Sequence, residues 1–432
     1  MRKVYLSVIG FSLLCRLNAW SQTKTDTVLF SKGKAPFSLY KPVTQDSIDY
    51  RPRRLRVDEI DFVSSYYQQS GNHSAIQGGI GDESVTDIAN GIDLNLVWLN
   101  NKLNKNSLLV GFGFDYHTAA SQAWVSSTGA SSTTGTRIYP SLDWTVENAK
   151  KGNSIGIGAY YSGEYNYQSL GLDLHFSQKT ANKNGEFTAK VQGYFDHVKL
   201  IYPSEFIPQS TVINSVVTSA SGTSSNGGHH ANIPSSPRTS LNASLSYAQM
   251  INSRLQAMVL GDVVTQQGYL GLPFHRVYFN TGKDTIEKLP SSRFKLPVGL
   301  RLNYFLGDNI ILRSYYRYYL DTWGVKSNTA GLEIPYKITP FFSISPFYRY
   351  YDQSAAKYFA PYGVHSPTDE YYTSNYEYAE FRSSFYGVGF RITPPKGVFG
   401  WQSMHELEIR YGHYTQTTDL VSDVISLNLG FK

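Results

Sequence analysis

The residues of this sequence best suited to chemistry are ionisable side chains that recur at alternate positions of extended-looking runs. Arg313 and Arg317 are four residues apart, so on a strand both side chains would point to one face about 13 Å apart. Asp173 and His175 are two residues apart and would also share a face. Such spacing collects charges on one surface, where they either pair with one another or meet a solute.

Known catalytic motifs are absent from the chain. We find no GxSxG, HExxH or Walker sequence. Gly78–Gly81 is glycine-rich but opens no predicted helix, and His405–Glu408 lacks the second histidine of a zinc helix. We interpret His229-His230 as a solvated pair rather than a metal site. We expect no enzyme, no metal and no cofactor, although a Ser–His site built from distant residues would leave no motif.

The composition favours an all-β protein. The 432 residues include 34 Tyr, 23 Phe and 36 Gly, and only 17% are charged, against about 25% in an average domain. No apolar run reaches the roughly 20 residues of a transmembrane helix. The aromatic content of 15% excludes a disordered chain, which would be poor in such residues.

The N-terminus has the pattern of a secretory signal peptide, predicted at 1–21. Arg2 precedes the apolar run Val4–Cys15, which is too short to span a bilayer, and small residues Ala19 and Ser21 fit a cleavage site. Cleavage would remove the one cysteine, so no disulfide is expected. It would also leave 36 basic against 33 acidic residues, an excess too small to indicate a nucleic-acid partner.

Alternation of apolar and polar residues with period two predicts 16 strands, with 14 to 18 compatible with the pattern. The runs span about 10 to 14 residues, whereas strands of soluble proteins average about five or six. A tilted strand that crosses an outer membrane needs about 9 to 11 residues. The predicted strands are 57–69, 90–99, 107–117, 136–147, 154–164, 167–178, 186–200, 239–251, 254–267, 293–306, 310–322, 326–338, 341–352, 376–392, 402–414 and 420–432.

The connections between these strands alternate in length. Connections after even-numbered strands are short, and all the long ones follow odd-numbered strands, which is typical of a transmembrane antiparallel β-barrel with short periplasmic turns and long extracellular loops. We therefore predict a barrel over 57–432 and a periplasmic extension over 22–56. Tyrosine clusters near the strand ends suit membrane-interface girdles, with cross-strand packing in a soluble sheet as the alternative. The long connections are 70–89, 118–135, 201–238, 268–292 and 353–375.

If the apolar positions face lipid, the alternate positions face the barrel interior. Charges of both signs there form either internal salt bridges that stiffen the barrel or a pore lining that selects solutes. The loop after the first strand carries Asp82, Glu83 and Asp87 among glycines and is long enough to act as a plug or constriction. The predicted lumen-lining residues are Asp93, Asp115, His117, Arg137, Asp143, Asp173, His175, Lys190, Asp262, Lys295, Arg301, Arg313, Arg317, Asp321, Arg349, Glu406, Glu408 and Arg410, with Glu333 and Arg382 also assigned inward.

The stretch Val57–Gln69, which continues through Gly71–Ile76, Gly78–Glu83 and Thr86–Leu94, resembles the DUF3570 family. The resemblance extends from about Val57 to the C-terminus. Members of that family look like outer-membrane β-barrels of Gram-negative bacteria and are common in Bacteroidota. The resemblance implies an outer-membrane location, and it carries no activity and no site residues.

Three function classes remain open: a channel for small solutes, a non-conducting structural or scaffold barrel, and a secreted soluble β-protein that binds a ligand. A barrel would contact outer-membrane lipid. Alternation that ends at Phe431 resembles the signal for the outer-membrane assembly machinery, a partner during biogenesis, although Lys432 follows it. The basic cluster Arg51–Arg56 could dock a periplasmic partner or be a solvated tail.

Overall fold

The computed structural model describes residues 55–118, 134–164, 167–200 and 234–432. They belong to one compact unit, Arg54–Lys432. The predicted signal peptide and nearly all of the predicted periplasmic extension lie outside the described residues, as do His229-His230.

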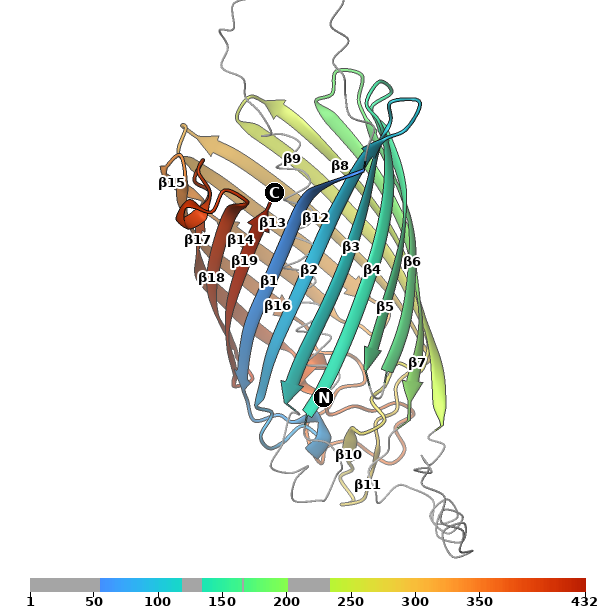
Figure 1. Cartoon of the computed structure of the whole chain (residues 1–432). Coiled ribbons are helices and arrows are strands. Elements are labelled where there is room, and N and C mark those ends of the chain that lie inside the picture. Colours follow the sequence, from blue (N-terminus) through green and yellow to red (C-terminus); the bar gives the residue numbers. More distant parts are fainter. Residues whose placement is uncertain (1–54, 119–133, 165–166, 201–233) are drawn as a thin grey trace, which may run out of the picture. The chain divides into compact units, whose positions relative to one another are not determined.

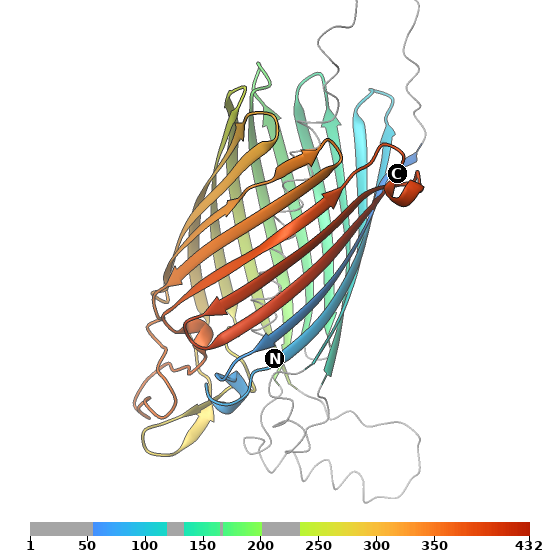
Figure 2. The ribbon, with the colours of Figure 1, turned by 90° about the vertical axis from the view of Figure 1, so that its left-hand side faces the viewer.

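Sixteen antiparallel strand positions close into a barrel, as predicted (Figures 1 and 2). β1 pairs with β2 on one side and with β19 on the other, and this last pairing closes the wall. The hairpin of β10 (Arg276–Tyr278) and β11 (Asp284–Ile286) lies outside the wall. The wall strands are β1 (Arg56–Ser70), β2 (Val85–Leu99), β3 (Lys105–Thr118), β4 (Thr134–Asn148), β5 (Asn153–Glu164), β6 (Tyr167–Lys179), β7 (Gly185–Lys199), β8 (Ser235–Asn252), β9 (Leu255–Gly268), β12 (Ser292–Leu306), β13 (Ile310–Asp321), β14 (Lys326–Glu333), β15 (Tyr336–Thr339), β16 (Phe342–Gln353), β17 (Phe381–Ile392), β18 (Met404–Gln416) and β19 (Leu420–Phe431).

β14 and β15 share one position in the wall, between β13 and β16. The sequence predicts a single strand over 326–338, but Pro335 interrupts it because proline has no N–H to donate to a ladder. The Pro335 carbonyl still accepts from Ile311 N at 3.0 Å, so the sheet continues across the break.

The starts of β2 and β17 differ most from prediction, by five residues each. β2 begins at Val85 rather than at 90, because Val85 already pairs with Gln69 of β1. β17 begins at Phe381 rather than at 376, because the 3-10 helix η3 (Tyr376–Tyr378) precedes it. Asn375 caps η3 by accepting from Glu377 N at 2.9 Å.

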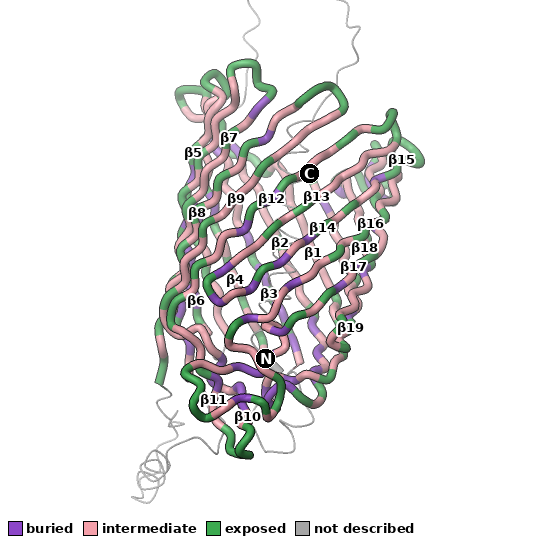
Figure 3. Tube along the Cα trace, turned by 180° about the vertical axis from the view of Figure 1, so that it is seen from behind, coloured by how far each residue is buried: buried purple, intermediate pink, exposed green. Residues whose placement is uncertain are grey.

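The two faces of the wall differ in chemistry along nearly every strand. On β3, Tyr116 is exposed, whereas Asp115 and His117 on the other face are buried; Figure 3 maps this variation in burial over the barrel. The buried face is the inner one, because its side chains reach each other across an intervening strand. Thr145 Oγ1 of β4, for example, lies 2.9 Å from His175 Nε2 of β6. Such contacts require a concave surface.

The connections separate into two ends of the barrel. The turn end holds the short connections 100–104, 149–152, 180–184, 253–254, 307–309 and 340–341 and the longer 393–403. The loop end holds three long described connections, 71–84, 269–291 and 354–380, together with the short turns 322–325 and 417–419.

None of the helices in the described residues is long and apolar enough to span a membrane.

Candidate functional site: the inward face and the loop end

All the residues predicted to face the lumen except Arg382 lie at inward positions of the wall strands, next to outward-facing neighbours. That they contact a solute stays a prediction. The assignment of Arg382 was wrong: Arg382 is exposed and Ser383, its neighbour, is buried inward. The inner face of β17 carries aromatic rings, such as Phe381, which packs against Tyr351 with ring centroids 5.6 Å apart. The assumption that apolar residues always face lipid fails there.

Asp173 is the centre of one inward network on β4 to β7. Its Oδ1 lies 2.9 Å from His175 Nδ1, and its Oδ2 lies 3.2 Å from Lys190 Nζ. Tyr160 Oη donates to the same Oδ2. Gly158 of β5 makes room for these contacts, because a Cβ there would overlap the Asp173 carboxylate. The sequence signal for this network is the Gly-x-Gly-x alternation of β5.

The ligand atoms of Asp143, Asp173 and His175 all lie within 4.8 Å of one another, which is compatible in size with a metal site. The Lys190 ammonium already provides the positive charge beside Asp173. Asp173 also accepts from Tyr160, so its lone pairs are largely used. The donor set therefore fits an internal ion-pair network better than a resident metal.

Other inward charges form similar clusters on neighbouring strands. Arg238 Nε of β8 donates to Asp196 Oδ2 at 2.7 Å and its Nη2 donates to Tyr167 Oη at 2.6 Å. Nearer the start of the chain, Arg137 lies 3.4 Å from Asp115. Each cluster joins two or three strands, so the charges stiffen the wall wherever they pair.

Glu333 of β14 joins charges from strands on both sides of it. Its carboxylate lies 3.1 Å from Arg410 of β18 and 3.9 Å from Arg313 of β13. Arg410 also lies 3.0 Å from Glu408. The guanidinium of Arg410 stacks over the Phe347 ring at 5.1 Å. Arginine and aromatic rings therefore share this part of the inner face.

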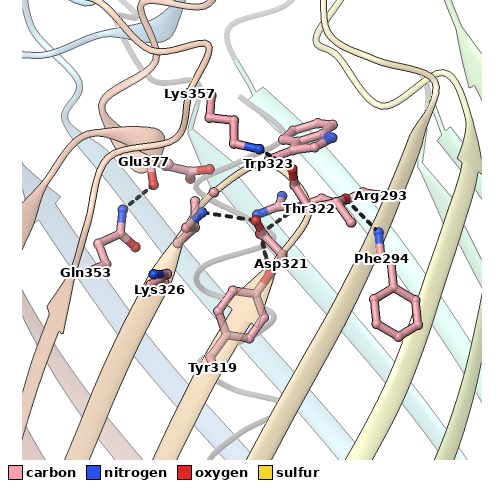
Figure 4. Close-up of polar contacts among 12 residues, drawn as sticks. Arg293, Phe294, Tyr319, Asp321, Thr322, Trp323, Lys326, Gln353, Lys357 and Glu377 are labelled. Carbon is pink, nitrogen blue, oxygen red and sulfur yellow. Dashed lines mark hydrogen bonds and ion pairs between the residues drawn. The ribbon is translucent and has the colours of Figure 1, made fainter.

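Arg293 and Asp321 form a buried ion pair at the loop end, shown in Figure 4. Arg293 Nε donates to Asp321 Oδ2 at 2.9 Å, and Tyr319 Oη donates to the same oxygen at 2.7 Å. Asp321 Oδ1 accepts from Val325 N at 3.0 Å, which fixes the turn after β13. The Arg293 guanidinium lies 4.4 Å from the centroid of Trp323, a ring only 2% exposed.

The loop 354–380 folds back onto this ion pair. Tyr378 lies under the Arg293 guanidinium at 5.4 Å and contacts Trp323 edge-on at 5.5 Å. Gln353 Nε2, on the inner face of β16, donates to the Glu377 carbonyl at 2.9 Å (Figure 4). This loop therefore contacts inward-facing side chains of the wall.

The three long loops 71–84, 269–291 and 354–380 pack together at the loop end, and we call them the loop cluster. Arg276 Nη1 donates to the Ile76 carbonyl at 2.9 Å, which joins the second loop to the first. Thr373 Oγ1 donates to Glu287 Oε1 at 2.5 Å, which joins the third to the second. No local sequence pattern indicates this cluster. The tyrosines of 371–378 are among the tyrosine clusters expected in a membrane-interface girdle, whereas several of these rings pack at the loop end.

The three residues predicted to form a plug lie in different settings. Asp82 is exposed and accepts from Ser84 N at 3.1 Å. Glu83 is buried, and a Cβ on Gly71 would overlap its carboxylate. Asp87 is not in the loop but in β2, where it faces inward, because the strand starts earlier than predicted. That the loop constricts the lumen stays a prediction.

The packing of loop 71–84 is expected to weaken as pH rises. Burial raises the pKa of Glu83 to about 7, with a further increase from Asp82 and an opposing effect of a hydrogen bond from the His73 backbone. The folded loop then binds more protons than the opened loop between the ordinary pKa and about 7, so the free energy of opening falls as pH rises through this range.

Limited proteolysis of loop 71–84 at pH 5.5 and pH 8 measures this effect. Cleavage of the native protein, relative to Glu83→Gln at the same pH, should increase at pH 8. The comparison at each pH removes the protease's own pH dependence. Equal ratios at both pH values would show that Glu83 does not control the loop.

The family described as "Protein of unknown function (DUF3570)" matches residues 107–424. The match covers most of the wall and confirms the family resemblance noted in the sequence. The stretch Val57–Leu94, on which that resemblance was noted, precedes the matched residues.

Several solved structures match this chain at very low identity. OccK1 (OpdK) of Pseudomonas aeruginosa is 6% identical over 86% of this chain and 97% of that chain, with a TM-score of 0.39. A loop L8 deletion mutant of OmpT, an outer membrane protein of Vibrio cholerae, is 10% identical over 87% and 99%, with a TM-score of 0.43. CdiB from Acinetobacter baumannii is 10% identical over 86% and 60%, with a TM-score of 0.42. The comparison with curated proteins gives no match.

Proposed function

We propose that this chain, which belongs to the DUF3570 family, forms a passage for small polar solutes across the outer membrane of a Gram-negative bacterium. The observation that carries the proposal is a closed wall of 16 antiparallel strand positions with apolar residues outside and charges inside. The predicted signal peptide would export the chain, and N-terminal sequencing of the membrane-fraction protein should then begin at Gln22.

The outer face supports insertion into a bilayer. Large apolar side chains are exposed along it, for example Leu172 and Leu174 on β6 and Ile155 and Ile157 on β5. Exposure of such an apolar surface to water is unfavourable, whereas contact with the lipid acyl chains is not.

The inner face supports passage of solutes. Barrels of 16 to 18 strands leave an aqueous channel, because their diameter exceeds what side chains can fill. Inward glycines let neighbouring side chains lie along the wall: a Cβ on Gly111 would overlap Ser141 and Asp93, and one on Gly156 would overlap His175. Charged inward residues would hold water and polar solutes in that channel.

A non-conducting structural barrel is the second candidate, and the loop cluster favours it. Three loops joined by buried hydrogen bonds at one end could hold that end closed. A scaffold barrel would show no conductance and would co-purify with a partner in mild detergent.

Conductance of the purified protein in planar bilayers separates the two candidates. A passage predicts discrete, reproducible current steps in 1 M KCl, where the Debye length is about 3 Å and wall charges are screened. Folding is checked in the same preparation by heat-dependent gel migration. Protein that migrates as a folded barrel but gives no current steps would contradict the passage and favour the scaffold.

A further inference from the structure

Charge on the inner wall is divided between two arcs. We call β1 to β9 the acidic arc and β12 to β19 the basic arc. In the described strands, apart from Arg56 and Asp58, which pair with each other at the bulge near the start of β1, the inward positions of the acidic arc hold twelve carboxylates and five cations, whereas those of the basic arc hold eight cations and four carboxylates. The two arcs therefore carry net charges of opposite sign.

The residues of each arc follow from the alternation of burial and from the strand register. The carboxylates of the acidic arc are Glu59, Asp61, Asp87, Asp93, Asp115, Asp143, Glu147, Glu164, Asp173, Glu186, Asp196 and Asp262, and its cations are Lys105, Arg137, Lys179, Lys190 and Arg238. The cations of the basic arc are Arg293, Lys295, Arg301, Arg313, Arg317, Arg349, Arg391 and Arg410, and its carboxylates are Asp321, Glu333, Glu406 and Glu408.

The arcs face each other across the lumen. β9 pairs with β12 and β19 pairs with β1, so the two arcs meet at only two seams and each takes about half of the wall. Figures 1 and 2 show the two groups of strands on opposing sides of the barrel. A solute inside therefore has carboxylates in excess on one side and cations in excess on the other.

Some of these charges have no ion-pair partner in the part of the chain that the structure describes. Lys295 and Arg317 are such residues on the basic arc, and Asp262 is one on the acidic arc. Asp321 is opposite Lys295 in the register, but its carboxylate is taken by Arg293 and Tyr319. Arg317 Nε is buried and has no hydrogen-bond acceptor among the described residues. The charges of these three groups are therefore not neutralised by an ion pair with a described residue.

We infer that the lumen prefers small zwitterions, which carry an ammonium and a carboxylate, over uncharged solutes of the same size. This inference rests on the passage proposed above. A zwitterion can direct its ammonium to the acidic arc and its carboxylate to the basic arc at the same time. An uncharged solute gains no electrostatic attraction from either arc. An ion of one sign is attracted to one arc and repelled by the other.

Swelling of proteoliposomes tests the preference with two probes, the zwitterion glycylglycine and the uncharged polyol xylitol. With the native protein at low ionic strength, glycylglycine should enter about threefold faster than xylitol, the size of effect expected for solvated ion pairs. In Arg301→Gln/Arg317→Gln/Arg349→Gln the ratio of glycylglycine entry to xylitol entry should fall to about one. The control Lys102→Gln/Lys150→Gln/Lys151→Gln removes three charges from exposed turns and should keep the native ratio.

The outcomes separate this inference from the proposed function. If xylitol does not enter with the native protein, the passage itself fails. If xylitol enters but glycylglycine is no faster, or if the triple arginine variant keeps the ratio, the zwitterion preference is overturned. Should that variant not fold by heat-dependent migration, Lys295→Gln combined with Asp262→Asn replaces it. Neither residue forms an ion pair with another described residue, and the same fall in ratio is expected.

Discussion

Replacement of Asp173 by alanine is expected to lower the free energy of unfolding of the barrel by about 3–5 kcal/mol. The Asp173 side chain is fully buried and accepts from Tyr160, His175 and Lys190. Its removal leaves Lys190 as an uncompensated charge and leaves the His175 and Tyr160 donors without their acceptor. Urea unfolding in lipid vesicles, followed by tryptophan fluorescence, measures the loss.

Asp262→Ala is the matched control for Asp173→Ala. Asp262 also faces inward on a wall strand, but no ion pair with another described residue holds it. Its replacement should change stability by about 0.5 kcal/mol or less. Equal losses for the two variants would show that the Asp173 network adds nothing beyond a carboxylate on the inner face.

Replacement of Trp323 by alanine is expected to lower the free energy of unfolding by about 3–5 kcal/mol, because packing at the loop end is lost. Trp323 is 2% exposed, stacks beneath Arg293 and contacts Tyr358 and Tyr378 of loop 354–380. Its Nε1 also donates to the Ser292 carbonyl at 3.0 Å. Without the ring, loop 354–380 loses the contacts of Tyr358 and Tyr378 with Trp323, so proteolytic cleavage within that loop should become faster.

Trp401→Ala provides the comparison for Trp323→Ala. Trp401 is 60% exposed at the turn end, so its loss should leave cleavage of loop 354–380 at the native rate. Current recordings add a second measurement. If the loop cluster narrows the passage, Trp323→Ala should show larger or noisier current steps than either the native protein or Trp401→Ala. Unchanged proteolysis and unchanged current in Trp323→Ala would remove Trp323 from any role in holding the loop.

The start of β17 at the loop end shows how far a local sequence pattern predicts structure. The predicted start of β17 at 376 was wrong because Tyr376–Tyr378 have the aromatic composition of a strand but form a 3-10 turn capped by Asn375. Propensity favours aromatic residues in strands. The turn forms because Tyr376 stacks on His73 of a distant loop, with ring centroids 3.5 Å apart, which no local window contains.

The orientation of side chains was predictable where only one face of a strand is apolar, and the prediction failed where both faces carry apolar residues. Asp115 and His117 alternate with aromatic neighbours that face outward, and they lie inward as predicted. On β17 the inner face itself holds Phe381 and Phe385, so polarity no longer distinguishes the faces and Arg382 was misplaced. Arginine stacking on inward rings, as for Arg349 over Phe385 at 5.1 Å, explains why rings are stable inside.

The sequence by itself determined the class of this fold, the number of strand positions and the end on which the long loops lie. These features follow from period-two alternation, run length and connection length, all of which are local. Only the tertiary structure decided which charges meet. Glu333 and Arg410 are far apart in the chain, and Asp173 reaches its partners because β5 presents glycines between the strands. Closure of the wall also created the two facing arcs, since opposite sides of a lumen exist only once β1 pairs with β19.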